Sequence, residues 1–274
     1  MHWLIQEGFD NDPAYIELCK NLARMKIPHS FCRAIPFSEN DIISDVDLDA
    51  ITEPIFTYGS YTLSKIAKKR GYNPGSFISE TIGMENLIKI FGNHMLNSDM
   101  VIDTLENIET EMPKFFLRPM EDTKSFPAKI YTLEEFKEFK RKIIEAGTEH
   151  YATIYPHTKV LISSPKEIEQ EYRFFVVDGK IVTSSQYKMG DRVVYSSNVD
   201  QHIQWYASSV VDMRNVLNNH PDVAYVLDIA VSKGNPYILE VNSINSSGLY
   251  AIDTQKFINA IENLTHRYKY KEID

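Results

Sequence analysis

In the first third of the chain, apolar and polar positions follow a strand–helix–strand rhythm. Residues 3–6 form a short β-prone run, and Asp12-Pro13 then predicts a helix start, with aspartate as the N-cap and proline in the first turn. Further β-prone runs follow at 29–36 and 55–58. Strands that alternate with helices are typical of a parallel or mixed sheet, so the pattern predicts an α/β domain.

The pattern then becomes richer in strands. Residues 114–118, 128–131 and 158–162 are β-prone, and Thr132 with Glu135 forms a capping box that opens one helix. A run at 171–177 turns through Asp178-Gly179 into a second run at 180–187, which is a strong hairpin signal. Apolar residues at helical spacing predict two more helices, over 200–219 and 253–266.

A second predicted hairpin, over residues 224–242, places polar groups where core residues are expected. Its first run, AYVLDIAVS, is apolar on both sides of Asp228, and its second run ends in Glu240, Val241 and Asn242. If Gly234 is the centre of the turn, Asp228 and Glu240 are each six residues away and lie directly opposite each other. Because side chains alternate along a strand, Asn242 then shares the face of Glu240.

Two opposed carboxylates repel each other and are costly to bury. Together with an amide they offer the hard oxygen ligands that suit Mg²⁺. Two interpretations stay open, a metal site and a sheet with one solvated face. The apolar run around Asp228 favours the metal site, because strands buried on both faces have this composition.

Three basic residues stand where a phosphate site needs cations. Arg118 ends an apolar strand before Pro119, Lys124 lies in the loop that follows, and Arg173 lies inside the run EYRFFVV. An arginine in such a strand must find an anion or reach water, and its planar group suits phosphate or carboxylate. A local salt bridge, for instance between Arg173 and Glu171, is the alternative for each cation.

Composition and charge narrow the class of protein. The 274 residues are 43% hydrophobic and 12% aromatic, which is ample for a folded core. The net charge of −9 argues against a general nucleic-acid binder, and a basic helix over 65–70 is more typical of a solvated face. Cys19 and Cys32 are expected to be core residues of a reduced, cytoplasmic protein. No signal peptide and no membrane span are predicted.

In their order, several segments resemble the ATP-grasp family, and most closely a bacterial and phage clade named for two arginines and one lysine. The segments are FFLRP, DTK, LISSP, EYRFFVVDGKIV, YVLDIAV and YILEVNS, within residues 111–268. The resemblance implies an α/β fold in which two sheet-containing lobes clamp ATP. These would be a small lobe over 111–165 and a large lobe over 166–274, preceded by a small Rossmann-like pre-ATP-grasp domain over 1–110.

The resemblance also assigns roles by position. Asp228, Glu240 and Asn242 would hold Mg²⁺ between the β- and γ-phosphates. The residues that it places around ATP are Arg118, Lys124, Leu161, Ile162, Ser163, Glu171, Arg173 and Lys188.

Among these, Arg118 and Lys124 would bind phosphate, and Arg173 would stabilise the transferring γ-phosphoryl group or an acyl-phosphate. Residues 161–163 would lie against adenine through their backbone. Glu171 would bind ribose or orient Arg173, two roles that the sequence does not separate.

The sequence departs from the family pattern at two places. The loop over 120–125 lacks the glycines that many relatives have over the phosphates, and Val226 stands where many ligases have an arginine two residues before the metal aspartate. Oxyanion stabilisation is therefore expected from Arg173 or Lys188. The loop over 243–248 is expected to hold the acceptor with its backbone amides and hydroxyls.

The activity implied is that of an ATP-dependent carboxylate–amine ligase that forms ADP, with a small-molecule or peptide substrate and an amine, less often a thiol, as acceptor. Two alternatives remain open, a small-molecule kinase of the same fold and a nucleotide-binding module without chemistry. The sequence does not distinguish a monomer from a homodimer.

Overall fold

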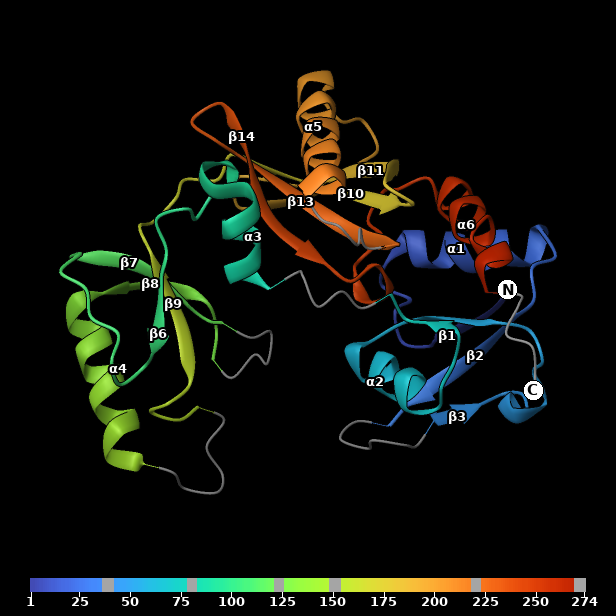
Figure 1. Ribbon diagram of the computed structural model, residues 1–274, viewed down its shortest axis with the longest axis horizontal. Coiled ribbons are helices and arrows are strands. Elements are labelled where there is room, and N and C mark those ends of the chain that lie inside the picture. Colours follow the sequence, from blue (N-terminus) through green and yellow to red (C-terminus); the bar gives the residue numbers. More distant parts are fainter. Residues whose placement is uncertain (36–41, 78–82, 121–125, 148–153, 218–222, 269–274) are drawn as a thin grey trace. The chain divides into compact units, whose positions relative to one another are not determined.

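The computed structural model describes residues 1–35, 42–77, 83–120, 126–147, 154–217 and 223–268 (Figure 1). The chain divides into two compact units. Met1–Ile82 and Ile168–Asp274 form the first unit, and Gly83–Glu167 forms the second. The beginning and the end of the sequence therefore share one unit, while the predicted three-domain boundaries stay a prediction.

The first unit begins with a mixed sheet of order β3-β2-β1-β4-β5. Strands β1, β2, β4 and β5 run parallel, and β3 pairs antiparallel with β2, which confirms the predicted parallel or mixed sheet. Its strands are β1 (His2–Gln6), β2 (His29–Ala34), β3 (Ile42–Ser44), β4 (Ile55–Tyr58) and β5 (Pro74–Gly75).

Both helices of this part begin at a capping residue. Helix α1 (Pro13–Arg24) starts as predicted, because the Asp12 side chain accepts a hydrogen bond from the Ala14 amide at 2.9 Å. Helix α2 (Tyr61–Lys69) follows β4, and the Ser60 hydroxyl accepts a hydrogen bond from the Leu63 amide at 3.3 Å.

The second sheet of the first unit is antiparallel throughout, with the order β12-β11-β10-β13-β14. Its strands are β10 (Gln170–Val177), β11 (Lys180–Met189), β12 (Arg192–Ser196), β13 (Ala224–Ser232) and β14 (Asn235–Asn242). Asp178-Gly179 and Lys233-Gly234 form two-residue turns with positive φ at both positions, which confirms the hairpin predicted at Asp178-Gly179. Helix α5 (Gln201–Leu217) covers one face of this sheet (Figure 1).

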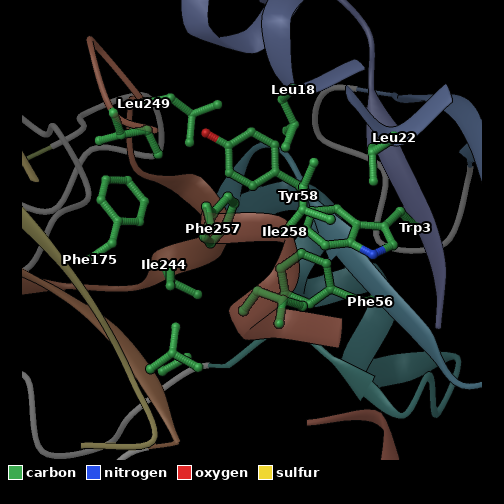
Figure 2. Packing of buried hydrophobic residues seen from close by; sticks show 14 of the residues in the cluster. Trp3, Leu18, Leu22, Phe56, Tyr58, Phe175, Ile244, Leu249, Phe257 and Ile258 are labelled. Carbon is green, nitrogen blue, oxygen red and sulfur yellow. The ribbon is translucent and has the colours of Figure 1, made fainter. Parts of the chain in front are cut away.

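The opposite face of the second sheet shares a hydrophobic core with the first sheet. Phe175 of β10 and Val226 of β13 face each other in the ladder and lie in the same cluster as Trp3 and Phe56. Helix α6 (Thr254–Glu262) lies beside α1 and adds Phe257 to this core (Figures 1 and 2). The two sheets therefore bury one continuous apolar layer, so they are expected to unfold together.

A segment after β14 fastens the two sheets to each other. It contains the short 3₁₀ helix Ile244–Ser246, in which Asn245 is fully buried. The Asn245 side chain accepts a hydrogen bond from the Phe77 amide at 2.8 Å and donates one to the Thr57 carbonyl. Its backbone carbonyl accepts from the Gly59 amide at 2.9 Å, so this asparagine joins the end of β14 to the end of β4.

The same segment is held a second time by Asp12. One oxygen of Asp12 caps α1, and the other accepts hydrogen bonds from the amides of Leu249 and Tyr250 at 3.1 and 3.4 Å. One carboxylate therefore both starts a helix of the first sheet and fixes the segment over 243–250.

The second unit contains a four-stranded antiparallel sheet of order β6-β9-β7-β8. Its elements are α3 (Met84–Phe91), β6 (Val101–Thr104), β7 (Lys114–Pro119), β8 (Lys129–Thr132), α4 (Leu133–Ala146) and β9 (Lys159–Ser163). The predicted capping box of α4 is present, with Thr132 and Glu135 bonded reciprocally. Helix α3 and strand β6 were not predicted, and β6 joins this sheet although it precedes residue 111.

The two cysteines are free thiols, as expected. Cys32 is buried, and burial raises the pKa of its thiol to about 12, which suits a core residue rather than a reactive one. Among the residues described, no helix is long and apolar enough to span a membrane.

The shared core predicts a contrast between the two tryptophans of the chain. Trp3 is 0% exposed and also donates to Glu262 at 2.7 Å, whereas Trp205 on α5 is 66% exposed. We expect Trp3→Ala to lower the free energy of unfolding by about 3–5 kcal/mol. Trp205→Ala should change it by no more than about 0.5 kcal/mol. Urea unfolding of both variants measures this, and equal losses would contradict the shared core.

The double role of Asp12 predicts a second contrast. Asp253 also caps a helix, α6, and among the described residues its side chain accepts hydrogen bonds only from that helix start. Asp253→Ala should therefore cost about 1 kcal/mol. Asp12→Ala should cost about 2–3 kcal/mol, because two further amides lose their acceptor. If chemical unfolding gives the same loss for both, Asp12 does not anchor the segment over 243–250.

Candidate active site

The site is built on β13, which is buried along its whole length. All nine residues of the strand are buried, and Asp228 is 0% exposed. Val226 and Asp228 point to the same face of the sheet. Val226 belongs to the hydrophobic core, so the carboxylate of Asp228 lies directly at the edge of that core. The interpretation of β13 as a solvated strand is therefore wrong, whereas its burial on both faces is confirmed.

Glu240 lies directly opposite Asp228, as predicted, but for a different reason. The turn is Lys233-Gly234 rather than a turn centred on Gly234, and simple counting from it would pair Asp228 with Leu239. A β-bulge at Leu239 adds one residue to β14 and brings Glu240 into place.

Arg173 of β10 forms a bidentate ion pair with Asp228. Its Nε donates to Oδ1 at 2.9 Å and its Nη2 donates to Oδ2 at 2.7 Å, within the ladder position where the two residues face each other. The alternative salt bridge between Arg173 and Glu171 is therefore wrong. Arg173 pairs with the predicted metal ligand itself, because the two strands neighbour each other in the sheet.

Burial and pairing act against each other in this ion pair. Burial raises the pKa of the Asp228 carboxyl above its ordinary value, and the Arg173 guanidinium opposes that rise. For Arg173, burial alone would lower the pKa, but the charge of Asp228 holds it above its ordinary value. The guanidinium therefore remains a cation in the site.

Asn242 bridges the two carboxylates. Its amide nitrogen donates to Glu240 at 2.9 Å and to Asp228 at 3.3 Å. The nitrogen and oxygen of such an amide are assigned from their hydrogen bonds, and a half-turn about the last bond would present the oxygen instead. The structure thus brings together all three predicted metal ligands.

The chemistry of this donor set fits Mg²⁺. Two carboxylates and one amide supply hard oxygen ligands, and Mg²⁺ ordinarily keeps waters or phosphate oxygens for its remaining positions. Among the described residues, no group of three or more histidine, cysteine, aspartate and glutamate side chains is placed to hold a metal on its own. A complete protein cage, such as zinc requires, is therefore not present in that part of the chain.

Glu171, Tyr187 and Lys188 form a second polar cluster in the same sheet. Lys188 donates to one oxygen of Glu171 and the Tyr187 hydroxyl to the other, each at 2.7 Å. Neighbours in a strand ordinarily point to opposite faces, but a β-bulge at Tyr187 lets both reach one carboxylate. Glu171 thus makes no hydrogen bond to Arg173, although it holds Tyr187, which does contact the arginine.

The Arg173 guanidinium lies beside a stacked pair of tyrosine rings, which the sequence did not predict. The rings of Tyr187 and Tyr250 stack with centroids 4.8 Å apart, and the guanidinium carbon lies 5.4 and 4.9 Å from them. The Gly248 carbonyl accepts from Arg173 at 3.2 Å. Tyr250 has φ of 56°, a conformation that is costly for a tyrosine, and residues held in this way cluster at functional sites.

Two hydroxyls of the segment over 243–248 donate within the protein, whereas Ser246 is exposed. Ser243 donates to the Phe77 carbonyl at 3.2 Å, and Ser247 donates to the Ser243 carbonyl at 2.7 Å. The Ser243 contact reaches the chain after β5, and the Ser247 contact stays within the segment. The role of this loop in holding an acceptor stays a prediction.

The remaining predicted ATP residues belong to the second unit. Arg118 of β7 pairs with Leu161 of β9 in the ladder, and Leu161, Ile162 and Ser163 are buried at the end of β9. Arg118 is half-buried and donates to the Pro119 carbonyl at 3.2 Å. The arginine and the 161–163 segment are therefore neighbours in one sheet, whereas Lys124 lies outside the described residues.

Solved structures share this fold at low sequence identity. D-cycloserine synthetase DcsG is 11% identical, with a TM-score of 0.65 over 97% of this chain and 100% of that chain. The D-alanine–D-alanine ligase of Bacillus anthracis, in complex with ATP, is 15% identical, with a TM-score of 0.60 over 97% and 98%. The L-amino acid ligase of Bacillus licheniformis is 11% identical, with a TM-score of 0.58 over 91% and 69%. Such likeness shows the fold alone.

A comparison with curated protein sequences finds no match. A family model for the ATP-grasp domain, that of family 2 in the clade named for two arginines and one lysine, matches residues 96–260. The match begins before residue 111 and so includes β6, which the sequence analysis had placed outside the ATP-grasp region. Since it covers more than half of the chain, and the two antiparallel sheets expected for the fold are present, the chain belongs to the ATP-grasp family, in that same clade.

Proposed function

We propose that this chain is an ATP-dependent ligase that activates a carboxylate as an acyl-phosphate for attack by an amine or a thiol, releasing ADP and phosphate. The observation that carries the proposal is the meeting of Arg173, Asp228, Glu240 and Asn242 on one face of the second sheet. Phosphoryl transfer depends mainly on positioning and charge neutralisation, and these residues are suited to both.

In the proposed reaction, an oxygen of the substrate carboxylate bonds to the γ-phosphorus as the bond from that phosphorus to ADP breaks. The amine then attacks the acyl carbon, phosphate leaves, and the amine loses its proton as the amide forms. No side chain has to act as a covalent nucleophile, which agrees with a site made of carboxylates, an amide and cations.

Asp228, Glu240 and Asn242 would hold Mg²⁺. When bound, the metal would polarise the phosphoryl oxygens and neutralise part of their charge. Arg173 would offer its guanidinium to the phosphoryl group, and its planar donors suit phosphate oxygens. Lys188 is the second candidate for stabilising an oxyanion. Its hydrogen bond to Glu171 of β10 holds its ammonium group against the strand that carries Arg173.

In the second unit, Arg118 and Lys124 would bind phosphate, and Leu161, Ile162 and Ser163 would lie against adenine. The pairing of Arg118 with Leu161 supports a common role for β7 and β9, since it sets a cation beside the predicted adenine segment. The backbone of residues 161–163 would carry that contact.

We further propose a small molecule or a peptide as the carboxylate substrate. The similar structures include ligases named for amino acids, and one, PsnB, was solved with a precursor peptide. The segment over 243–250 lies beside Arg173, which makes it the first place to look for acceptor contacts.

A product screen tests the proposed function. The purified chain is incubated with ATP, Mg²⁺ and pooled amino acids, peptides and nucleotides, while ADP release is followed and products are identified by mass spectrometry. A joined product with one ADP per bond is the expected result. A stable phosphorylated product would instead identify a kinase, and tight binding of MgATP without ADP release would identify a module without chemistry.

We expect Glu240→Gln to lower ATP turnover by on the order of a hundredfold or more, because a neutral amide replaces one of the two metal carboxylates. Glu240 is a cleaner target than Asp228, whose loss would strand the buried Arg173. The matched control is Glu169→Gln, because Glu169 is exposed beside β10 and accepts from the Gly234 amide. Unchanged turnover in Glu240→Gln would remove this residue from the metal site.

A further inference from the structure

We propose that Arg173 is a built-in counter-ion that the divalent cation must displace from Asp228. Without ligand, the guanidinium neutralises the buried carboxylate, and the cation takes its place when it binds. The inference rests on the proposed function in one respect, because the cation is the one that the ATP-grasp site would hold. It goes beyond that function by assigning the arginine two successive partners.

Asp228 has few acceptor positions left for a metal. A carboxylate offers about four lone-pair positions in all. Arg173 uses one on each oxygen, and the Asn242 amide uses another on Oδ2. Both positions on Oδ2 are therefore taken, so a metal gains this oxygen only when one of these donors leaves. At the position that remains on Oδ1, the metal would lie directly beside the guanidinium.

Electrostatic repulsion also acts between Arg173 and the cation. Asp228 is 0% exposed, so its surroundings screen charges weakly. A divalent cation and a guanidinium on the same buried carboxylate would repel each other strongly under such conditions. Arg173 and the cation are therefore expected to occupy Asp228 in turn.

The displaced guanidinium has other partners within the site. The Gly248 carbonyl and the rings of Tyr187 and Tyr250 contact it independently of Asp228. Aromatic faces stabilise a desolvated cation. Arg173 can therefore give up Asp228 and remain beside the site, where an incoming phosphate group can pair with it.

This exchange couples the cation to the nucleotide. A free cation must break the ion pair without compensation, whereas a cation that arrives with phosphates provides Arg173 with a new anion. The apparent affinity for the cation alone is then the intrinsic affinity multiplied by the fraction of protein molecules in which Asp228 is released from Arg173.

The test is a titration of nucleotide-free protein with Mn²⁺, which stands in for Mg²⁺ at oxygen ligands and can be followed by water-proton relaxation. We expect Arg173→Gln to bind Mn²⁺ at least about tenfold more tightly than the wild type, since the competing cation is gone. The matched control is Arg192→Gln, because Arg192 is an exposed arginine of β12 in the same sheet. Equal affinity in Arg173→Gln and the wild type would overturn the inference, and so would the absence of measurable binding in both.

Two further measurements keep the test decisive. In the double variant Arg173→Gln with Asp228→Asn, the gain in Mn²⁺ affinity should disappear, and a gain that persists would mean that the cation does not use Asp228. Should Arg173→Gln fail to fold, the Nε–H signal of Arg173 is followed by nitrogen-15 NMR in the wild type, assigned with Arg173→Lys. The signal should shift when the diamagnetic Mg²⁺ binds, whereas an unchanged signal in the bound protein would overturn the inference.

These outcomes separate the inference from the proposed function. Tighter Mn²⁺ binding by Arg173→Gln together with an empty product screen would leave the counter-ion role standing and the ligase proposal wrong. A joined product together with equal Mn²⁺ affinities would do the reverse.

Discussion

The buried ion pair between Arg173 and Asp228 is the interaction on which the rest of the first unit depends. Two charges inside a protein are costly to desolvate, and their attraction offsets that cost only when the geometry is good and other groups satisfy the remaining acceptors. Here the arginine is bidentate, Asn242 donates to the same carboxylate, and Gly248 accepts from the arginine. These partners come from the neighbouring strands of the second sheet and from the segment over 243–250.

Two β-bulges explain how so many polar groups gather on a sheet whose neighbouring positions are core. In a regular ladder, alternation would direct Tyr187 and Lys188 to opposite faces and would set Leu239 opposite Asp228. One extra residue in β11 brings Tyr187 to Glu171, and one in β14 brings Glu240 to Asp228. Bulges next to active sites commonly redirect a side chain in this way. The site is thus made by two local irregularities of this sheet, one in β11 and one in β14.

The features that the sequence predicted well are those that depend on neighbouring residues. The start of α1 at Asp12-Pro13, the capping box at Thr132 and the hairpin at Asp178-Gly179 follow from local backbone chemistry. The partner of Arg173 lies 55 residues away on another strand, and choosing it requires the order of the strands in the sheet. The ring of Tyr250 depends in addition on a backbone with positive φ, for which a tyrosine gives no sequence signal.

Within the described residues, the switch point of the first sheet is covered by the chain itself. Ligands of such sheets ordinarily bind outside the carboxyl ends of the strands where the strand order reverses, here β1 and β4. At that place Ser60 donates to the Gln6 side chain, and the Gly59 amide donates to the carbonyl of Asn245, so the chain's own segment covers the ends of both strands. A side chain at position 59 would collide with Gln6, which explains the glycine. Asp12, just after β1, in turn holds the amide of Tyr250, whose ring lies against Arg173. The first sheet is therefore linked to the guanidinium through Asp12 and Tyr250. The position of the arginine thus depends on the folding of both sheets together.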